Sequence, residues 1–263
     1  MTSLAGKVVV VTGASRGIGR ALAGAYARRG ATVALLARDE VQLHGVASEL
    51  AGEGARCGSF RCDVTSDADC AAAIDGVRAR FGGIDVLVSN AGVTLLSPVA
   101  ALPLDELRDV LDVNLLGPLR LLKLVLPEML DRRSGQIVVI TSVAAARGLP
   151  GLGGYAATKA ALHTLIDALR AEVDGRGVDV LEVAPGKTTT DILASSRGPG
   201  AGHRPLDRLQ PTMTAEFVAE RVARASERGT RRLTLGLGAR LIALAERVSP
   251  ALTDRLAARA MSR

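Results

Sequence analysis

Short apolar runs alternate along this chain with longer segments in which apolar residues recur at helical spacing. Five runs are almost continuously hydrophobic and end in small or polar residues: KVVVVTG (7–13), TVALLAR (32–38), IDVLVSNAG (84–92), GQIVVITS (135–142) and VDVLEVAPG (178–186). Such runs are typical of strands that are buried on both faces of a parallel sheet. Weaker runs at 55–64 and 231–236 predict two further strands.

Helical segments fill the intervals between these strands. Residues 18–30, 40–54 and 155–177 have helical periodicity, and each segment ends in glycine, as helix C-termini often do. Alternation of strands and helices on this scale predicts an α/β fold. We therefore expect one Rossmann-type domain over 1–263, with a doubly wound, seven-stranded, mostly parallel sheet, helices on both faces and a C-terminal helical extension.

Two segments depart from the alternation. Residues 194–213 are rich in Gly, Pro and Ser and follow the sixth predicted strand, so they are expected to form a lid over a ligand site. Residues 239–263 carry leucines at helical spacing together with five arginines. This extension has three interpretations: helices packed on the body or at an oligomer interface, a wall over an apolar substrate pocket, or peripheral contact with a membrane surface.

Composition excludes several classes of protein. The formal net charge is +6, but the arginines are dispersed and aromatics are only 2% of residues, so we expect no nucleic-acid partner. The three cysteines form no CxxC motif and the three histidines lie far apart in sequence, so we expect no metal site. The first strand begins too early for a signal peptide, and no apolar run reaches the ~18–20 residues of a membrane span. These features favour a cytoplasmic protein.

The first predicted strand runs directly into a glycine-rich turn, TGASRGIG (12–19). Glycine permits a tight turn and lets backbone N–H groups approach a pyrophosphate closely. The helix that follows adds unpaired donors and the positive end of its dipole. A strand, a turn and a helix in this order predict a dinucleotide site that includes Gly13, Ser15, Arg16, Gly17, Ile18 and Gly19.

The end of the second predicted strand indicates which dinucleotide is bound. An NAD enzyme commonly has an acid there to bind the ribose 2′-OH, whereas this chain has Arg38. Arg38 and Arg16 together are suited to a 2′-phosphate, because guanidinium groups are charged, planar donors. Asp39 could accept from a ribose, but we assign it to the N-cap of the next helix. We therefore predict NADP(H).

The segment YAATK (155–159) places a tyrosine and a lysine one helical turn apart. A free phenol has a pKa near 10, which is too high for ready proton exchange at neutral pH. A nearby cation favours the phenolate and lowers that pKa. The alternative is a pair on a helix surface that contributes a few tenths of a kcal/mol.

Together these segments resemble the short-chain dehydrogenase/reductase family over about residues 5–190. The resemblance rests on TGASRGIG, the pair Asp63–Val64, NAG (Asn90, Ala91, Gly92), NLLG (114–117), Ser142, YAATK, and PG (Pro185, Gly186) followed by Thr188 and Thr190.

The resemblance implies a role for each motif. Tyr155 would exchange the proton with the substrate oxygen, and Ser142 would hydrogen-bond that oxygen. Lys159 would hold the nicotinamide ribose, and Asn114 would hold a water that links Lys159 to solvent. Of the other motifs, Asp63–Val64 would contact adenine, and Pro185, Gly186, Thr188 and Thr190 would lie on the nicotinamide side. A homodimer or homotetramer paired through 104–130 and 155–175 is also implied.

The sequence indicates the type of reaction more clearly than it indicates the substrate. The extended C-terminus resembles that of family members acting on apolar alcohols and ketones, such as steroid- or retinoid-like molecules. An alternative is a 3-oxoacyl-thioester reductase, because Arg133 and Arg176 resemble residues that dock an acidic carrier. A non-catalytic NADP-sensing regulator is a third possibility, although a sensor does not need the proton donor Tyr155.

Overall fold

The computed structural model describes residues 3–189, 197–199, 212–236, 251 and 253–254. Most of the predicted lid (194–213) and of the C-terminal extension (239–263), together with Thr190, lies outside these residues. Within them the elements are β1 (Val8–Thr12), α1 (Gly17–Ala27), β2 (Thr32–Ala37), α2 (Glu40–Gly52), β3 (Cys57–Arg61), α3 (Asp67–Phe81), β4 (Val86–Ser89), η1 (Val99–Ala101), α4 (Leu104–Leu111), η2 (Asp112–Leu116), α5 (Gly117–Asp131), β5 (Gly135–Ile140), η3 (Val143–Ala145), α6 (Gly153–Glu172), β6 (Val178–Pro185), α7 (Ala215–Glu227) and β7 (Arg232–Leu235).

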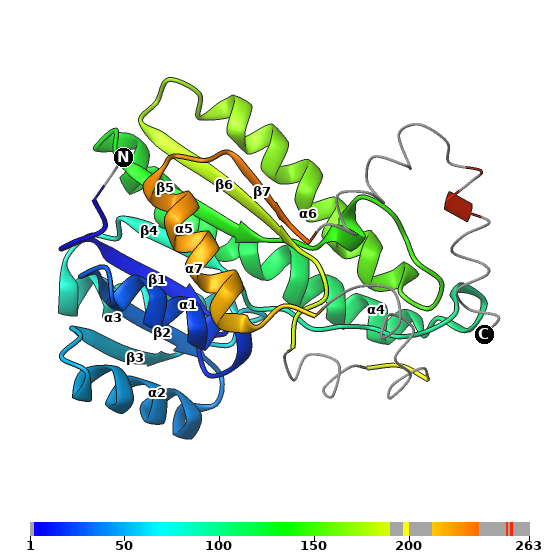
Figure 1. The fold of residues 1–263 in the computed structure, drawn as a ribbon, viewed down its shortest axis with the longest axis horizontal. Helices are drawn as coiled ribbons and strands as arrows, with labels where there is room; N and C mark the ends of the chain where they lie inside the picture. The colour runs from blue at the N-terminus through cyan, green and yellow to red at the C-terminus, as the bar shows by residue number, and fades with distance from the viewer. Residues whose placement is uncertain (1–2, 190–196, 200–211, 237–250, 252, 255–263) are drawn as a thin grey trace.

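The described strands form one seven-stranded sheet in the order β3-β2-β1-β4-β5-β6-β7 (Figure 1). Every neighbouring pair is parallel, so the sheet is more regular than the mostly parallel one that we predict. The chain reverses its direction of travel across the sheet between β1 and β4. In such folds a ligand binds at this switch point, outside the carboxyl ends of the strands.

Successive residues of each strand point to opposite faces of the sheet, and both faces are covered by helices. In β1, Val9 and Val11 pack with α1, α2 and α7 on one face, whereas Val8 and Val10 pack with α3, α5 and α6 on the other. All four valines are buried. A strand covered on both sides has no need of polar positions, which explains its uniformly apolar sequence.

The segment over 104–130, which is expected to pair between subunits, is not one continuous α-helix. It consists of α4 and α5 joined by η2, a π-helical segment of five residues that contains Asn114. Single π-helical turns are rare and often mark functional sites, because the extra residue redirects side chains. Within the described residues, the other predicted strands and helices are confirmed to within a few residues at their ends.

Parts of the two irregular segments contact the body of the domain. Arg197 pairs with the loop after β4: its N–H donates to Thr94 O at 2.9 Å, and its carbonyl accepts from Leu96 N at 2.9 Å. In the C-terminal extension, Thr253 Oγ1 accepts a hydrogen bond of 2.8 Å from Arg147, which follows η3. In the described part of the chain, no helix combines the length and the apolar character that crossing a bilayer requires.

Candidate active site

The glycine turn between β1 and α1 has the geometry that its sequence predicts. Gly13 and Gly17 have φ angles of 63° and 53°, a region that L side chains rarely adopt. A Cβ on Gly19 would lie 2.0 Å from Gly13 O, so the third glycine is required for α1 to approach the turn. No side chain caps the start of α1, so its first N–H groups face the turn without a side-chain acceptor. These features fit a pyrophosphate.

Hydrogen bonds join the ends of β1 and β4 across the switch point. Thr12 Oγ1 accepts from the N–H groups of Asn90 and Ala91, both at 2.9 Å. Asn90 Nδ2 in turn donates to Thr12 O at 2.9 Å. Asn90 therefore has a structural role in the described contacts, and Thr12 is a site residue that sequence reasoning did not identify.

A cavity of about 640 Å³ opens at these strand ends. Its described lining brings together most of the predicted dinucleotide residues. The lining residues are Gly13, Ser15, Arg16, Gly17, Ile18, Gly19, Ala37, Arg38, Asp39, Gln42, Cys62, Asp63, Val64, Asn90, Ala91, Gly92, Val93 and Val113. Of these, Gln42, Cys62, Val93 and Val113 have no motif that reveals them in the sequence, because the fold alone brings them to the edge of the sheet.

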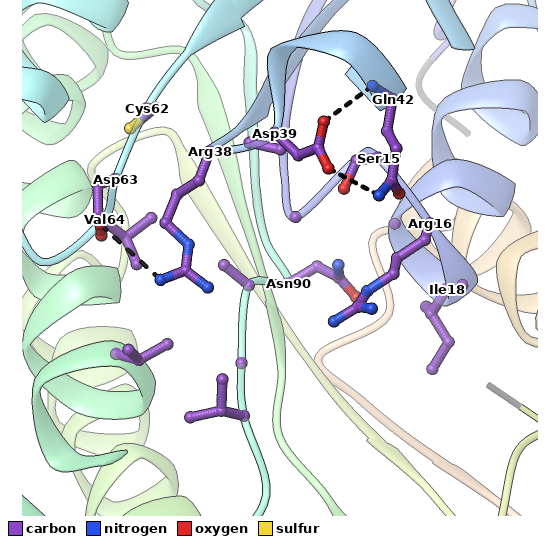
Figure 2. Close-up of a pocket in the computed structure, with 18 residues that line it drawn as sticks. Ser15, Arg16, Ile18, Arg38, Asp39, Gln42, Cys62, Asp63, Val64 and Asn90 are labelled. Atoms are coloured by element: carbon purple, nitrogen blue, oxygen red, sulfur yellow. Dashed lines mark hydrogen bonds and ion pairs between the residues drawn. The ribbon is translucent and has the colours of Figure 1, made fainter. Parts of the chain in front are cut away.

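Figure 2 shows Arg16 and Arg38 extending into this cavity from different elements. Asp39 is occupied elsewhere: its carboxylate accepts from Gln42 N at 3.0 Å and from Gln42 Nε2 at 2.7 Å, and it caps α2. The N-cap assignment of Asp39 is thus confirmed. The cavity therefore has two guanidinium groups, Arg16 from the glycine turn and Arg38 from the end of β2, and Asp39 is engaged with α2.

Asp63 and Val64 line the cavity beyond β3. Asp63 Oδ1 accepts from Thr65 N at 3.0 Å and from Thr65 Oγ1 at 2.8 Å, while Oδ2 lies 3.9 Å from Arg38 Nη1. This ion pair is long and Arg38 is exposed, so it holds the arginine weakly. Arg38 is therefore able to turn toward an anion in the cavity.

Tyr155 and Ser142 meet at the carboxyl edge of the sheet. Tyr155 lies in the first turn of α6, and Ser142 follows β5 and caps η3 by accepting from Ala144 N at 3.1 Å. Burial raises the pKa of the Tyr155 phenol, and a hydrogen bond with Ser142 opposes that rise. The net direction is opposite to the lowering that we predict from the sequence, because burial outweighs the favourable contact.

Lys159 is buried on the same face of α6, with only 4% of its surface exposed. Its Nζ atom donates to Ile140 O at 3.1 Å, at the end of β5. Burial lowers the pKa of Lys159 to about 8. The cation is thus directed at the strand that presents Ser142.

Asn114 is fully buried in the π-helical segment and bridges three parts of the site. Its amide bonds both the N–H and the carbonyl of Val93 at 2.9 Å, and its Nδ2 donates to Thr158 Oγ1 at 3.0 Å. Thr158 Oγ1 donates to Tyr155 O at 2.8 Å. Asn114 therefore fixes the loop after β4 against the helix that carries Tyr155. Its implied role of holding a water stays a prediction.

Gly92 connects the cavity with these catalytic candidates. A Cβ at this position would lie 3.2 Å from Asn114 Oδ1 and 3.4 Å from Lys159 Nζ. A small residue here leaves room between the cavity and the lysine.

The last predicted site residues follow β6. Pro185 ends that strand, Gly186 N donates to Leu235 O at 2.9 Å, and Thr188 Oγ1 donates to Gly186 O at 3.1 Å. They lie at the same edge of the sheet as Ser142, but they are not in the described lining of the cavity.

Sequence reasoning also missed a polar cluster behind α6. His163 and Asp167, one turn apart on α6, and Glu182 of β6 each place a potential ligand atom within 4.8 Å of the others.

Comparison with known protein families gives one match over most of the chain. A family model described as short chain dehydrogenase matches residues 7–199. The 3-oxoacyl-[acyl-carrier-protein] reductase FabG of Salmonella typhimurium is 38% identical over 190 residues, which are 72% of this chain and 77% of that protein. The glycine betaine reductase ATRR of Emericella nidulans is 40% identical over 193 residues, which are 73% of this chain but only 15% of that much longer protein.

Solved structures show the same architecture. A short chain dehydrogenase/reductase of Burkholderia phymatum in complex with NAD has a TM-score of 0.86 at 25% identity and 96% coverage of both chains. An actinorhodin polyketide ketoreductase with NADPH has a TM-score of 0.80 at 30% identity, covering 91% of this chain and 99% of that one. An alcohol dehydrogenase of Thermococcus sibiricus with 5-hydroxy-NADP has a TM-score of 0.78 at 33% identity, covering 88% and 96%.

Proposed function

The chain belongs to the short-chain dehydrogenase family, and from this premise we propose that it is an NADP(H)-dependent oxidoreductase that interconverts a ketone or aldehyde with an alcohol. The observation that carries the proposal is that Tyr155 and Ser142 meet beside the buried Lys159, at the edge of the sheet where the cavity opens next to the glycine turn. A proton donor, an oxyanion donor and a cation at one edge suit the reduction of a carbonyl.

Each catalytic candidate takes one role in the reduction. The hydride would come from a nicotinamide cofactor when it is bound. Tyr155 gives its phenolic proton to the carbonyl oxygen, and Ser142 donates a hydrogen bond to that oxygen as negative charge develops. The phenol is protonated at neutral pH and can donate, but burial raises its pKa, so Ser142 and the cation of Lys159 have to favour the phenolate that forms. Lys159 stabilises the phenolate that is left and holds the nicotinamide ribose hydroxyls.

The preference for NADP(H) is supported by the charges around the cavity. Arg16 and Arg38 enter it, while Asp39 is bound to Gln42. A carboxylate directed inward would repel a 2′-phosphate, and two guanidinium groups attract it. The relatives with bound cofactors include both NAD and NADP complexes, so this preference rests on the side chains of this chain.

We propose an apolar substrate, such as a steroid-, retinoid- or lipid-like ketone. The described surface near the strand ends exposes Val99 and Leu104 at 75% and 63%. Arg147, five residues after Ser142, holds Thr253 and Asp254 at 2.8 and 2.5 Å, and Thr253 is buried. This contact supports a C-terminal extension that takes part in the substrate site.

The second candidate function is reduction of a 3-oxoacyl thioester on a carrier protein. It is favoured by the 38% identity to the Salmonella reductase. Arg133 and Arg176, the proposed carrier contacts, lie in the turns just before β5 and β6. These turns are at the edge of the sheet opposite the cavity, so a carrier docked there would have to serve the site of another subunit.

Pairing of subunits and cellular location complete the proposal. Leu116 and Leu165 are exposed at 45% and 38% on the segments expected to pair in a homodimer or homotetramer. The thiol of Cys62 donates to Cys70 Sγ at 4.0 Å and the two are not joined by a disulfide, which suits the reducing cytoplasm.

The proposal is tested by following the loss of NADPH absorbance with a panel of carbonyl substrates. The panel contains small ketones, bulky apolar ketones and an acetoacetyl thioester. Turnover of the bulky ketones supports the first candidate, and selective turnover of the thioester supports the second. Tight NADPH binding without turnover of any member would favour a non-catalytic NADP sensor.

A further inference from the structure

A buried carboxylate lies behind the catalytic candidates, at a position that the proposed mechanism does not use. Glu182 is in β6 and only 2% exposed. Its Oε1 accepts from Thr141 Oγ1 at 3.1 Å and lies 2.7 Å from His163 Nδ1, while its Oε2 accepts from Arg232 Nε at 3.0 Å. These partners come from the end of β5, from α6 and from β7.

The face of β6 that carries Glu182 is otherwise apolar. Val178 and Val180, which alternation places on the same face of the strand, belong to the core packed against α5 and α6. A buried ion pair is often no more stabilising than apolar residues of the same volume, because desolvation is costly. Stability therefore does not explain the carboxylate of Glu182, and its role in holding its hydrogen-bond partners in position explains it better.

The outer part of this cluster consists of ion pairs rather than an open ligand site. Asp167 accepts from Arg170 Nη1 at 2.5 Å and from Arg232 Nη2 at 2.7 Å. Both carboxylates near His163 are therefore paired with guanidinium groups. A divalent cation would have to displace these pairs against the repulsion of two positive charges, so we assign no metal to the cluster.

The partners of Glu182 are next to the catalytic candidates along the chain. Thr141 immediately precedes Ser142, and His163 lies one helical turn after Lys159. Thr141 Oγ1 shares its proton between Glu182 and the carbonyl of Val183, which is 3.0 Å away. Glu182 thus joins the strand that presents Ser142 to the helix that presents Tyr155.

We propose that Glu182, through Thr141 and His163, is a positioning residue that holds Ser142 at hydrogen-bonding distance from Tyr155. This inference rests on the proposed function for its effect on turnover, but not for its effect on Tyr155 itself. Small displacements of catalytic groups are costly, since a shift of 1 Å can reduce turnover by about 100-fold.

The chain offers a direct readout of this position. It has two tyrosines and no tryptophan, and burial raises the pKa of Tyr26 to about 12. In a Tyr26→Phe background the ultraviolet phenolate signal therefore comes from Tyr155 alone, and Tyr155→Phe confirms the assignment by removing it. The hydrogen bond with Ser142 lowers the pKa of Tyr155, so loss of that bond must raise it.

The decisive variants are Thr141→Val and Glu182→Gln. Both are expected to raise the titration midpoint of Tyr155 and to lower kcat about tenfold, with KM for NADPH unchanged. Removing the negative charge of Glu182 would by itself lower that midpoint, so a rise in Glu182→Gln identifies a loss of position and not of charge. Thr141→Ser, which restores the hydroxyl, should recover both values.

Gln136→Leu is the matched control. Gln136 is a neutral, buried side chain at the other end of β5, where its Nε2 donates to Ser226 O at 3.1 Å. It should lower thermal stability without moving the titration of Tyr155. If Glu182→Gln does not fold, Thr141→Val alone decides the question.

An unchanged midpoint in Thr141→Val, or an equal shift in Gln136→Leu, would overturn the proposal. The titration needs neither cofactor nor substrate. A shifted midpoint in a protein that reduces no carbonyl would therefore refute the proposed function and leave the positioning role standing.

Discussion

Lys159 donates a 3.1 Å hydrogen bond from Nζ to the main-chain oxygen of Ile140, and so directs a buried cation at the strand that presents Ser142. This neutral acceptor does not replace the hydration that the ammonium group loses, and burial lowers the pKa of Lys159 to about 8.

This burial predicts a cost in stability. The pKa falls from 10.5 to about 8 on folding, which corresponds to about 3 kcal/mol of unfavourable free energy below pH 8. Between these values the unfolded chain binds more protons, so stability rises with pH. Lys159→Met should remove this slope and increase the free energy of unfolding at neutral pH, by up to about 3 kcal/mol, while turnover is lost. Urea unfolding at neutral and alkaline pH measures both effects, and an unchanged slope would contradict the assignment.

Tyr155→Phe should abolish turnover, because no other described group is placed beside Ser142 to supply the proton. NADPH affinity should stay within about twofold, since the substitution removes one hydroxyl at the far end of the cofactor site. Steady-state kinetics and NADPH fluorescence titration measure the two quantities. Tyr26→Phe, at the other tyrosine, is the control and should retain activity. Full activity of Tyr155→Phe would refute its role.

The double variant Arg16→Ala/Arg38→Ala should reverse the cofactor preference. Each charged hydrogen bond to a 2′-phosphate contributes about 1.5–3 kcal/mol, so loss of both should lower kcat/KM for NADPH by at least about 100-fold. The value for NADH should change little. Arg20→Ala is the matched control, because it removes an exposed arginine of α1 that lies 2.6 Å from Glu49 of α2. Equal losses of kcat/KM for NADPH and NADH would show that the two arginines do not bind the 2′-phosphate.

Gly19→Ala should distort the glycine turn between β1 and α1. Its Cβ would lie 2.0 Å from Gly13 O, so the turn must move and NADPH binding should weaken at least about tenfold. Gly45→Ala in α2 is the control, because its Cβ would meet nothing within 4 Å. That change should stabilise the protein by about 0.5–1 kcal/mol. Thermal denaturation with and without NADPH compares the pair.

Arg147→Ala should raise KM for bulky apolar ketones severalfold, because it removes the contacts with Thr253 and Asp254. KM for a small ketone should be unchanged. Deletion of residues 239–263 should have the same selective effect. Arg108→Ala, which breaks an exposed pair with Asp105 on α4, serves as the control. An unchanged KM in a folded deletion variant would remove the extension from the substrate site.

The sequence by itself determined the order of strands and helices, the glycine turn and the spacing of Tyr155 and Lys159. These features are local: a strand buried on both faces must be apolar throughout, and a tight turn at positive φ requires glycine. The capping role of Asp39 was also readable, because a cap bonds within its own turn.

Only the tertiary structure decided the direction of the Tyr155 pKa shift, the π-helical setting of Asn114, and the cluster around Glu182. The pKa depends on how much water the fold removes from the phenol, which spacing along the chain does not state. Asn114 and Glu182 act through partners on other elements, and such contacts exist only once the sheet and helices are packed. Sequence patterns specify what lies within one turn or strand, whereas packing specifies what each buried polar group finds beside it.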